Sequence, residues 1–294
     1  MEAKINQAHI PVMTKEVMSF LDINPNGKYV DGTCGLGGHS KLIQNELSKD
    51  GILIALDIDN IAIQSCKSSL SETNSKLYIK KKSYSDLPIV LNHLKINKVN
   101  GILLDLGLSS IQLDSENRGF SYKKDSYLDM RFDQDNKIDA ASIINKSSET
   151  QLADIIYYYG EERRSRSIAA KIINTRPMTN VNDLVNAIKK STPPRNRNKT
   201  LARVFQAFRI AVNKELEKLS EFLTKYIQCL EKGGKIIIIS FHSLEDRLVK
   251  RNFKKYSNNG LLKILTKKPM IATEIERMYN SRSKSAKLRC AEKI

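Results

Sequence analysis

Short apolar runs alternate with amphipathic runs over the first third of the chain. Runs of aliphatic and β-branched residues predict buried strands, whereas apolar residues spaced three or four apart predict helices. The predicted strands are Lys28–Asp31, Ile52–Ile58, Leu77–Lys81 and Gly101–Leu106. A helical run follows each of the first three, so the expected fold class is α/β, with a parallel sheet and right-handed crossovers.

The alternation stops between residues 113 and 199, where no strand is expected. Four helical segments are predicted there: Ala140–Asn145, Gln151–Tyr159, Arg164–Thr175 and Val181–Lys190. We therefore expect an inserted all-helical domain at residues 113–199, and a larger domain formed by residues 1–112 and 200–294.

The last third of the chain returns to the pattern of a sheet. One long helix is predicted at Leu201–Glu231, and Gly233–Gly234 predicts a turn before a fifth strand at Lys235–Phe241. Two later runs, Leu261–Leu265 and Lys287–Ala291, are expected to pair as closing strands.

Length and composition narrow the class of protein. A chain of 294 residues exceeds the usual size of one domain, which agrees with an insertion. The first eleven residues contain no apolar leader segment, and apolar runs such as Ile236–Ile239 are too short to span a bilayer. These features predict a cytoplasmic protein that does not act at a membrane.

The cysteines are scattered through the chain, and no two of them form a Cys-x-x-Cys pair. They are Cys34, Cys66, Cys229 and Cys290. The four histidines are equally dispersed, so neither a disulfide framework nor a metal site is indicated. We expect free, buried thiols.

Positive charge is concentrated outside residues 1–112. The net charge is +17 overall, but residues 1–112 hold 12 basic and 11 acidic groups, whereas residues 200–294 hold 21 and 9. The first arginine is Arg118. This distribution favours a surface for a polyanion such as nucleic acid, although a solvated lysine-rich surface would give the same counts.

A glycine-rich turn follows the first predicted strand. Gly35, Gly37 and Gly38 stand between that strand and a helix that begins near Ser40. Such a turn lets backbone amides approach a bound cofactor, and it is also common as a simple corner of an α/β domain.

Two acidic residues favour the cofactor interpretation of this turn. Asp31 ends the first strand, where a carboxylate would repel a pyrophosphate but would suit the α-amino group of a cationic cofactor. Asp57 ends the second strand, 20 residues after Gly37, which is the spacing of an acid that binds ribose hydroxyls. The combination predicts S-adenosylmethionine.

Candidate chemistry also follows the fourth and fifth strands. Asp105 ends the fourth strand and is expected at the cofactor mouth, unless it only caps a turn. After the fifth strand, Ser243 with Asp246 could form a helix capping box. His242 is then either a hydrogen-bonding spacer or a catalytic group.

A glycine-interrupted loop of the insertion mixes aromatic and cationic residues. Phe120 could stack on a base while Arg118 or Arg131 binds a phosphate. Alternatively, Phe120, Met130 and Phe132 are core residues.

Segments spread over nearly the whole chain carry a resemblance to a known family. They are His9–Met13, Asp31–Ser40, Gly101–Ser110, Arg118–Ser121, Leu128–Arg131, Tyr159–Arg163, Phe205–Ile210, Ser240–Arg247 and Ser283–Arg289. As an ordered set, they resemble the bacterial 16S ribosomal RNA cytosine-N4 methyltransferase family. Two positions depart from its pattern: Tyr84 stands where Phe is common, and Ser281 stands where Pro is expected.

The resemblance implies a class I S-adenosylmethionine-dependent methyltransferase fold, Rossmann-like, with an inserted helical domain for substrate recognition. It implies methylation of N4 of a decoding-centre cytidine in 16S rRNA of the small ribosomal subunit. The cofactor-binding residues are then expected, together with Asp31, at Gly37, Gly38, His39, Asp57, Tyr84, Asp105 and Gln112. No metal is expected.

The amine of cytosine needs an acceptor for its proton during methyl transfer. Asp105 and Ser109 are the candidate catalytic residues. Asp105 could instead only bind cofactor, leaving Ser109, Ser110 or backbone carbonyls to receive the amine hydrogens.

Two rival functions remain. A DNA amino-methyltransferase would carry Asp/Asn-Pro-Pro-Tyr after the fourth strand, and the chain has Asp105-Leu106-Gly107-Leu108 instead, so DNA is not the expected partner. An rRNA-binding assembly factor that keeps a cofactor pocket is the other rival. The sequence leaves open whether the protein is a monomer or a homodimer.

Overall fold

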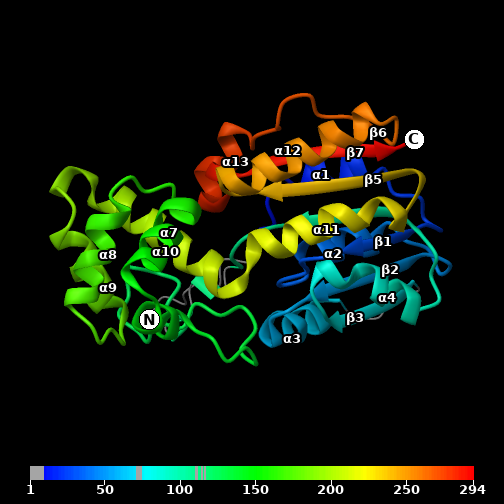
Figure 1. The fold of residues 1–294 in the computed structure, drawn as a ribbon. Helices are drawn as coiled ribbons and strands as arrows, with labels where there is room; N and C mark the ends of the chain where they lie inside the picture. The colour runs from blue at the N-terminus through cyan, green and yellow to red at the C-terminus, as the bar shows by residue number, and fades with distance from the viewer. Residues whose placement is uncertain (1–9, 71–74, 110–111, 114, 116) are drawn as a thin grey trace. The chain divides into compact units, whose positions relative to one another are not determined.

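The computed structural model describes residues 10–70, 75–109, 112, 113, 115 and 117–294 (Figure 1). The chain folds as two compact units. The sheet unit comprises the described residues up to Gly107 and from Glu217 onward, and the helical unit comprises those within 108–216. His9 and Ser110, which the sequence singled out, lie outside the described residues.

The sheet unit alternates strands with helices, as the hydrophobic pattern predicts. Its strands are β1 (Lys28–Asp31), β2 (Ile52–Asp57), β3 (Lys76–Lys81), β4 (Val99–Asp105), β5 (Leu230–Ser240), β6 (Leu262–Ile264) and β7 (Lys287–Lys293). Its α-helices are α1 (Thr14–Leu21), α2 (Gly38–Asn45), α3 (Asn60–Ser69), α4 (Leu87–His93), α11 (Glu215–Cys229, which starts at the boundary), α12 (Ser243–Asn258) and α13 (Glu274–Tyr279). Short 3-10 turns lie at η1 (Tyr84–Asp86) and η3 (Ser281–Ser285).

The described strands form one sheet in the order β3-β2-β1-β4-β5-β7-β6. Strands β1 to β5 run parallel, with Asp31 beside Ala55 of β2 and Leu103 of β4. Strand β7 runs antiparallel to both β5 and β6, which confirms the expected closing pair. The expected α/β fold class is therefore confirmed.

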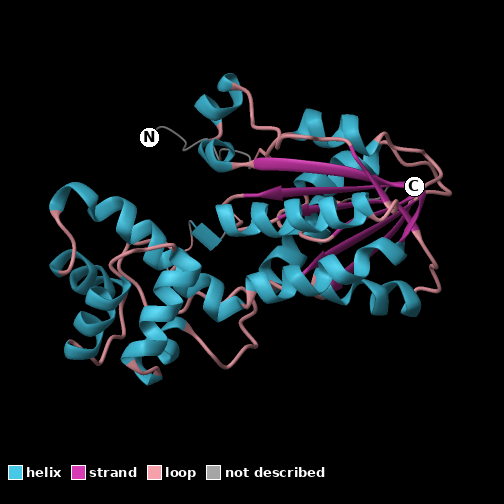
Figure 2. Ribbon diagram, turned by 45° about the horizontal axis from the view of Figure 1, so that its top comes forward, coloured by secondary structure: helices cyan, strands magenta, loops and turns pink. Residues whose placement is uncertain are grey.

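Helices cover both faces of this sheet (Figure 2). Ile54 and Leu56 of β2 pack into a core with α4, α11 and α12, while Leu53 and Ala55 face a second core with α1, α2 and α3. Strands buried on both faces read as nearly continuous apolar runs, which is why their positions were predictable.

The expected Gly233–Gly234 turn lies inside β5 rather than before it. Val99 pairs with Leu230 and Gly101 pairs with Lys235, so β5 carries the extra residues of a bulge. Gly233 has φ +77°, a conformation that glycine adopts without strain.

The helical unit has its own core. Its α-helices are α6 (Ala140–Lys146), α7 (Glu149–Gly160), α8 (Ser165–Asn174), α9 (Val181–Lys190) and α10 (Arg197–Asn213), and η2 (Pro194–Asn196) precedes α10. Gly160 allows α7 to approach α10 closely, because a Cβ there would lie 2.7 Å from the Arg203 carbonyl oxygen. The basic, proline-containing stretch at residues 193–199, which the sequence suggests as a loop, forms η2 and the start of α10.

The predicted single helix at Leu201–Glu231 is wrong. The chain breaks at Lys214, whose φ is +51°, so α10 ends at Asn213 and α11 begins at Glu215. The Asn213 side chain bonds three backbone groups: it donates to the Met130 and Arg209 carbonyls and accepts from the Phe132 N–H. Because α10 packs on α6, α7 and α9, it belongs to the helical unit, and the division expected after residue 199 falls after 216.

One charged junction of the helical unit is buried rather than solvated. The Glu162 carboxylate accepts hydrogen bonds from the Thr200 hydroxyl and from the Arg164 N–H, and it pairs with Arg203.

Among the described residues, no helix is both long enough and apolar enough to cross a membrane.

Candidate cofactor and active site

Three aspartates end neighbouring parallel strands at one edge of the sheet. Asp31 is the last residue of β1, Asp57 of β2 and Asp105 of β4. Parallel strands present their carboxyl ends at the same edge, which is where open α/β sheets bind ligands. The structure therefore gathers the acids that the sequence singled out.

The glycine turn follows β1 at this edge. Gly37 has φ +84° and forms the N-cap of α2, and Gly38 opens the helix. A Cβ on Gly38 would lie 2.7 Å from Pro11 Cγ, so the glycine lets the Ile10–Met13 segment pack against the turn. The early segment, which the resemblance alone had marked, is thus part of the turn's support.

Asp57 holds the glycine turn to the end of β2. Its Oδ2 accepts the Gly35 N–H at 3.0 Å, and its Oδ1 accepts the Asp59 N–H at 3.0 Å. Burial raises the pKa of Asp57 to about 6, although these two hydrogen bonds favour the ionised form. Each carboxylate oxygen retains acceptor capacity for a ligand hydroxyl.

Asp31 is almost fully buried. It accepts a 2.6 Å hydrogen bond from the Ser40 hydroxyl and a 3.2 Å bond from the Thr33 N–H. Burial raises the pKa of this carboxyl, and nearby His39 and the two hydrogen bonds oppose the rise. Asp31 therefore joins the end of β1 to the start of α2, besides placing negative charge at the edge.

His39 is also buried and is oriented by a backbone carbonyl. Its Nε2 lies 2.9 Å from the Val12 oxygen, and because a carbonyl only accepts, Nε2 carries the proton. Burial lowers the pKa of His39, so the ring is neutral at pH 7 and its Nδ1 is unprotonated. That nitrogen lies 3.8 Å from Asp105 Oδ2.

Asp105 is the least satisfied acid of the edge. Its backbone N–H donates to the Thr33 hydroxyl at 2.7 Å, but its buried Oδ1 accepts no hydrogen bond from the described residues. Burial raises the pKa of Asp105 to about 6, the Arg282 charge opposing and the Glu245 charge adding to the rise. An unsatisfied buried oxygen in a native site marks a place where a ligand can donate.

Arg282 and Thr33 are site residues that the sequence analysis missed. The Arg282 guanidinium lies 5.8 Å from the centre of the Phe241 ring, directly after β5, and its charge acts on both His39 and Asp105. A basic stretch at residues 282–287 was visible in the sequence, but its distance along the chain hid this proximity. Thr33 was visible only as part of the turn motif.

His242 is the N-cap of α12. Its Nδ1 accepts from the Glu245 N–H at 3.4 Å, and the Glu245 carboxylate accepts from the Phe241 N–H at 2.9 Å. The predicted capping box of Ser243 and Asp246 is therefore wrong by one residue. Asp246 instead binds Arg289 of β7 at 2.7 Å, and the spacer interpretation of His242 is the one its contacts support.

The remaining predicted residues are placed as follows. Tyr84 opens η1, and its ring meets Phe222 edge-on at 5.6 Å. Its Cβ lies 3.0 Å from where a Cβ on Gly32, the residue after β1, would stand. Ser109 and Gln112 belong to the helical unit, where the Ser109 N–H donates to Gln112 Oε1 at 3.0 Å. The roles of Ser109, Gln112 and Tyr84 at the cofactor remain predictions.

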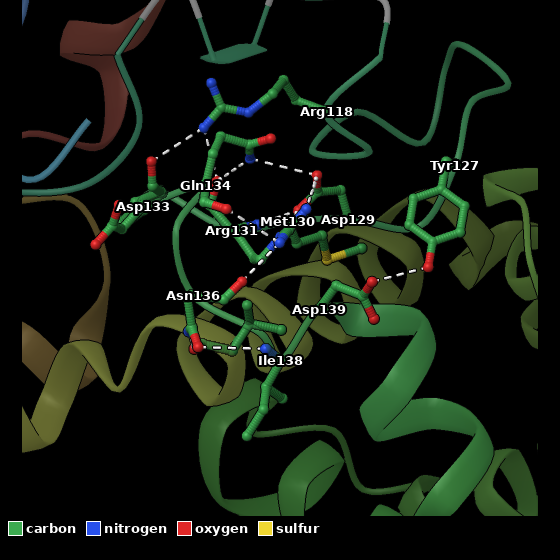
Figure 3. A network of polar contacts seen from close by, with 12 residues as sticks. Arg118, Tyr127, Asp129, Met130, Arg131, Asp133, Gln134, Asn136, Ile138 and Asp139 are labelled. Carbon is green, nitrogen blue, oxygen red and sulfur yellow. Dashed lines mark hydrogen bonds and ion pairs between the residues drawn. The ribbon is translucent and has the colours of Figure 1, made fainter. Parts of the chain in front are cut away.

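In the helical unit, the loop that mixes basic and aromatic residues, around Arg118 and Arg131, is held by a network of polar contacts (Figure 3). Arg118 donates to the carbonyls of Arg131 and Phe132, while Arg131 makes a two-pronged pair with Asp129 at 2.7 and 3.0 Å. Phe120 is buried and stacks on Phe132 at 5.6 Å. These contacts favour the core interpretation over base stacking.

All four cysteines are free and buried. Cys34 and Cys66 lie under the glycine turn in the second core, and burial raises the pKa of Cys229 to about 11. Neutral thiols of this kind fill space and do not act as nucleophiles.

The edge suits a cationic ligand that carries hydroxyl groups. Three carboxylates supply negative charge and acceptors, a positive-φ glycine turn allows close approach of a ligand to the backbone, and Asp105 Oδ1 supplies an unused acceptor. The residues present therefore fit S-adenosylmethionine.

Comparison with known proteins finds one methylase family along nearly the whole chain. The family model described as the MraW methylase family matches residues 6–294. A protein of Caldicellulosiruptor saccharolyticus, "Ribosomal RNA small subunit methyltransferase H", is 47% identical over 97% of this chain and 99% of its own. A protein of Thermosipho africanus with the same name is 48% identical over 97% and 98%.

A solved structure titled as an rRNA methylase from Streptococcus thermophilus is 11% identical. It covers 98% of this chain and 99% of its own, with a TM-score of 0.48, and this weak likeness adds nothing to the sequence matches.

Proposed function

Because the chain belongs to the MraW methylase family, we propose that it transfers a methyl group from S-adenosylmethionine to N4 of a decoding-centre cytidine in 16S rRNA. Relatives that match nearly the full length carry the name of a small-subunit ribosomal RNA methyltransferase. The partner is then the rRNA of the small ribosomal subunit, and the site of action is the bacterial cytoplasm.

Fold and cofactor follow from the family. The seven-stranded sheet of the described residues, with antiparallel β7 between β5 and β6, is the arrangement of a class I methyltransferase. Methylases of this family depend on S-adenosylmethionine, so the predicted cofactor is confirmed. When bound, it supplies a methyl group on a positively charged sulfur.

The observation that carries the proposal is the free oxygen of Asp105. Its Oδ1 is buried without a donor among the described residues, at the end of the central strand β4. An exocyclic amine is a hydrogen-bond donor that must lose a proton when it gains a methyl group. Asp105 Oδ1 is the acceptor that we assign to that proton.

His39 can stabilise the charge of Asp105. Its unprotonated Nδ1 lies 3.8 Å from Oδ2, which is longer than a hydrogen bond, so a proton gained by His39 would stabilise the Asp105 carboxylate through its charge. Burial places the pKa of Asp105 at about 6, which makes it a stronger base than an exposed aspartate while leaving it ionised at pH 7.

We assign the other edge residues to binding and orientation. Asp57 offers its free acceptor sites to the ribose hydroxyls, and Asp31 places its charge near the cofactor's α-amino group. Gly37 and Gly38 keep the turn open to the ligand. Orientation accounts for much of the rate, since the sulfonium is already a strong electrophile.

The helical unit is the proposed substrate-recognition domain. Two of its first residues keep the roles proposed from the sequence, Ser109 in catalysis and Gln112 in cofactor binding. The target base must leave its stack to reach Asp105, as in other enzymes that modify bases.

Of the rivals, a DNA amino-methyltransferase lacks support because Asp105-Leu106-Gly107-Leu108 replaces its motif.

Label transfer separates an enzyme from an assembly factor. Small subunits from a strain without this activity would be incubated with the protein and with S-adenosylmethionine labelled in its methyl group. We expect label in the 16S rRNA, none in matched DNA, and none when the subunits are already modified. Label only on protein, or no label with a folded and cofactor-competent protein, would favour the assembly-factor function.

A further inference from the structure

Helix α13 presents an apolar face that no described residue covers. Ile275, Met278 and Tyr279 are 70, 79 and 80% exposed, and Ile271, just before the helix, is 57% exposed. Positions i, i+3 and i+4 share one face of a helix, so these three side chains form a continuous surface. Exposed apolar clusters of this kind mark interaction sites more often than isolated apolar residues do.

The opposite side of α13 is firmly held, so the exposure is not fraying. Glu276 Oε1 accepts the Met13 N–H at 2.8 Å, and the Asn280 side chain donates to the Ile10 carbonyl at 2.9 Å. The Thr273 hydroxyl caps the helix by accepting from the Glu276 N–H. The apolar face is therefore a fixed platform.

Basic residues are frequent in the segment that carries this platform. Residues 267–284 hold five basic and two acidic side chains, a net charge of +3; the basic ones are Lys267, Lys268, Arg277, Arg282 and Lys284. The Nε of Arg277 is buried and donates no hydrogen bond to a described residue. An apolar surface on a positively charged segment suits a polyanion with exposed apolar faces, whereas a second copy of the chain would bring the same charge.

Unpaired RNA has the required chemistry. Its bases stack on aromatic and apolar side chains while its phosphates pair with lysine and arginine, whereas a duplex hides its base faces. A base that enters an enzyme pocket also leaves its neighbours unstacked, and these neighbours need a surface to rest on.

The platform is connected to the proposed active site. Segment η3 follows α13 directly and carries Arg282 to the Phe241 ring at the end of β5. The Ile10–Met13 segment, which α13 holds, provides the Val12 carbonyl that orients His39. These contacts link α13 to residues of the site that contains Asp105.

We propose that the face formed by Ile275, Met278 and Tyr279 binds the unpaired rRNA strand next to the target cytidine. The proposal deepens the proposed function, on which it rests for the identity of the RNA, but binding of unpaired RNA can be tested without any methyl transfer.

The probe is a fluorescently labelled oligocytidine of about ten nucleotides, within the usual range for single-strand binding. Anisotropy titrations would compare the parent protein with Tyr279→Ala and Met278→Ser. Each should raise the Kd about five- to tenfold or more, whereas Tyr279→Phe should stay within about twofold, because the aromatic face is retained. A hairpin duplex of equal charge should bind equally well to all variants.

Ile89→Ser is the matched control, since Ile89 is 56% exposed on α4 of the same unit. It should leave oligocytidine affinity unchanged, and calorimetric S-adenosylmethionine affinity should be unchanged in every variant. Unaltered oligocytidine affinity in Tyr279→Ala and Met278→Ser would overturn the proposal even if methylation occurs as proposed. A shift of the monomer–dimer equilibrium in these variants, seen by sedimentation with unaltered RNA affinity, would assign the face to a second copy instead.

Discussion

His39 Nδ1 lies 3.8 Å from Asp105 Oδ2, and the Val12 carbonyl fixes the ring so that its unprotonated nitrogen faces the carboxylate. This distance is longer than a hydrogen bond, so the two groups interact through charge when the ring is protonated. They lie on different elements, α2 and β4, that meet at the carboxyl edge of the sheet.

Asp105→Asn should stabilise the ligand-free protein at pH 8 while slowing methyl transfer. The Asp105 pKa is raised to about 6 against 3.8, so the parent's free energy of unfolding falls as the pH rises from about 4 to 6. An amide removes the cost of an ionised, unsatisfied carboxylate, by roughly 1 to 3 kcal/mol. Urea denaturation at pH 5 and pH 8 measures the effect.

Asp246→Asn is the contrasting control for this experiment. Its carboxylate is paired with Arg289 at 2.7 Å, so the substitution should destabilise the protein. A loss of stability in Asp105→Asn as well would show that the Asp105 charge is satisfied in the free protein.

Asp57→Ala should weaken S-adenosylmethionine binding about 10- to 100-fold, since a charge-assisted acceptor for the ribose hydroxyls is lost. Calorimetry measures the affinity, and thermal unfolding reports how far the loss of the Gly35 and Asp59 bonds loosens the turn. The exposed Asp50→Ala is the control and should bind normally. Normal affinity in folded Asp57→Ala would remove Asp57 from the ribose site.

Cofactor affinity should rise with pH up to about pH 7 and then level off. The carboxyls of Asp57 and Asp105 have pKa values of about 6, and a cationic ligand favours their ionised forms, so binding releases protons below that pH. Below pH 6, ionisation of each group increases the cofactor affinity by up to about tenfold per pH unit. Calorimetry between pH 5 and 8, in buffers of different ionisation enthalpy, should show proton release that Asp105→Asn reduces; a flat profile would contradict this assignment.

RNA affinity should depend steeply on salt, because phosphate contacts release counterions. Neutralising Arg195, Arg197 and Lys199 together should flatten that dependence. Arg195 is exposed in η2 and Lys199 is exposed near the start of α10, while Arg197 also donates to the Thr192 carbonyl at 3.3 Å. An unchanged slope, measured with a 16S rRNA fragment, would mean that this basic segment is only a solvated surface.

The strands and the acids at their ends could be predicted because each depends on local sequence. A buried parallel strand is a short apolar run, and Asp31, Asp57 and Asp105 are simply the next polar residues at its end. The helix break at Lys214 could not be predicted this way, since no glycine or proline marks it. Its left-handed residue is stabilised by Asn213, whose partners Met130 and Phe132 lie over eighty residues earlier.

The rest of the site depends on contacts between distant segments. Arg282 reaches Phe241 and influences Asp105 only because β7 returns beside β5. The structural role of Arg118 could not be predicted either. Its guanidinium donates hydrogen bonds to the carbonyls of residues 131 and 132, whereas the sequence suggested that it binds a phosphate. Helix α13 was not predicted, and its apolar face has no partner among the described residues.

The central claim is that the chain methylates N4 of a cytidine with Asp105 at the junction of cofactor and base. The most direct test is mass spectrometry of nucleosides from unmodified small subunits incubated with labelled S-adenosylmethionine and either the parent or Asp105→Ala. The account predicts labelled N4-methylcytidine with the parent, formed roughly 10²-fold or more slowly with the folded variant. Label on adenine N6 or cytosine C5, or equal rates for the two proteins, would contradict it.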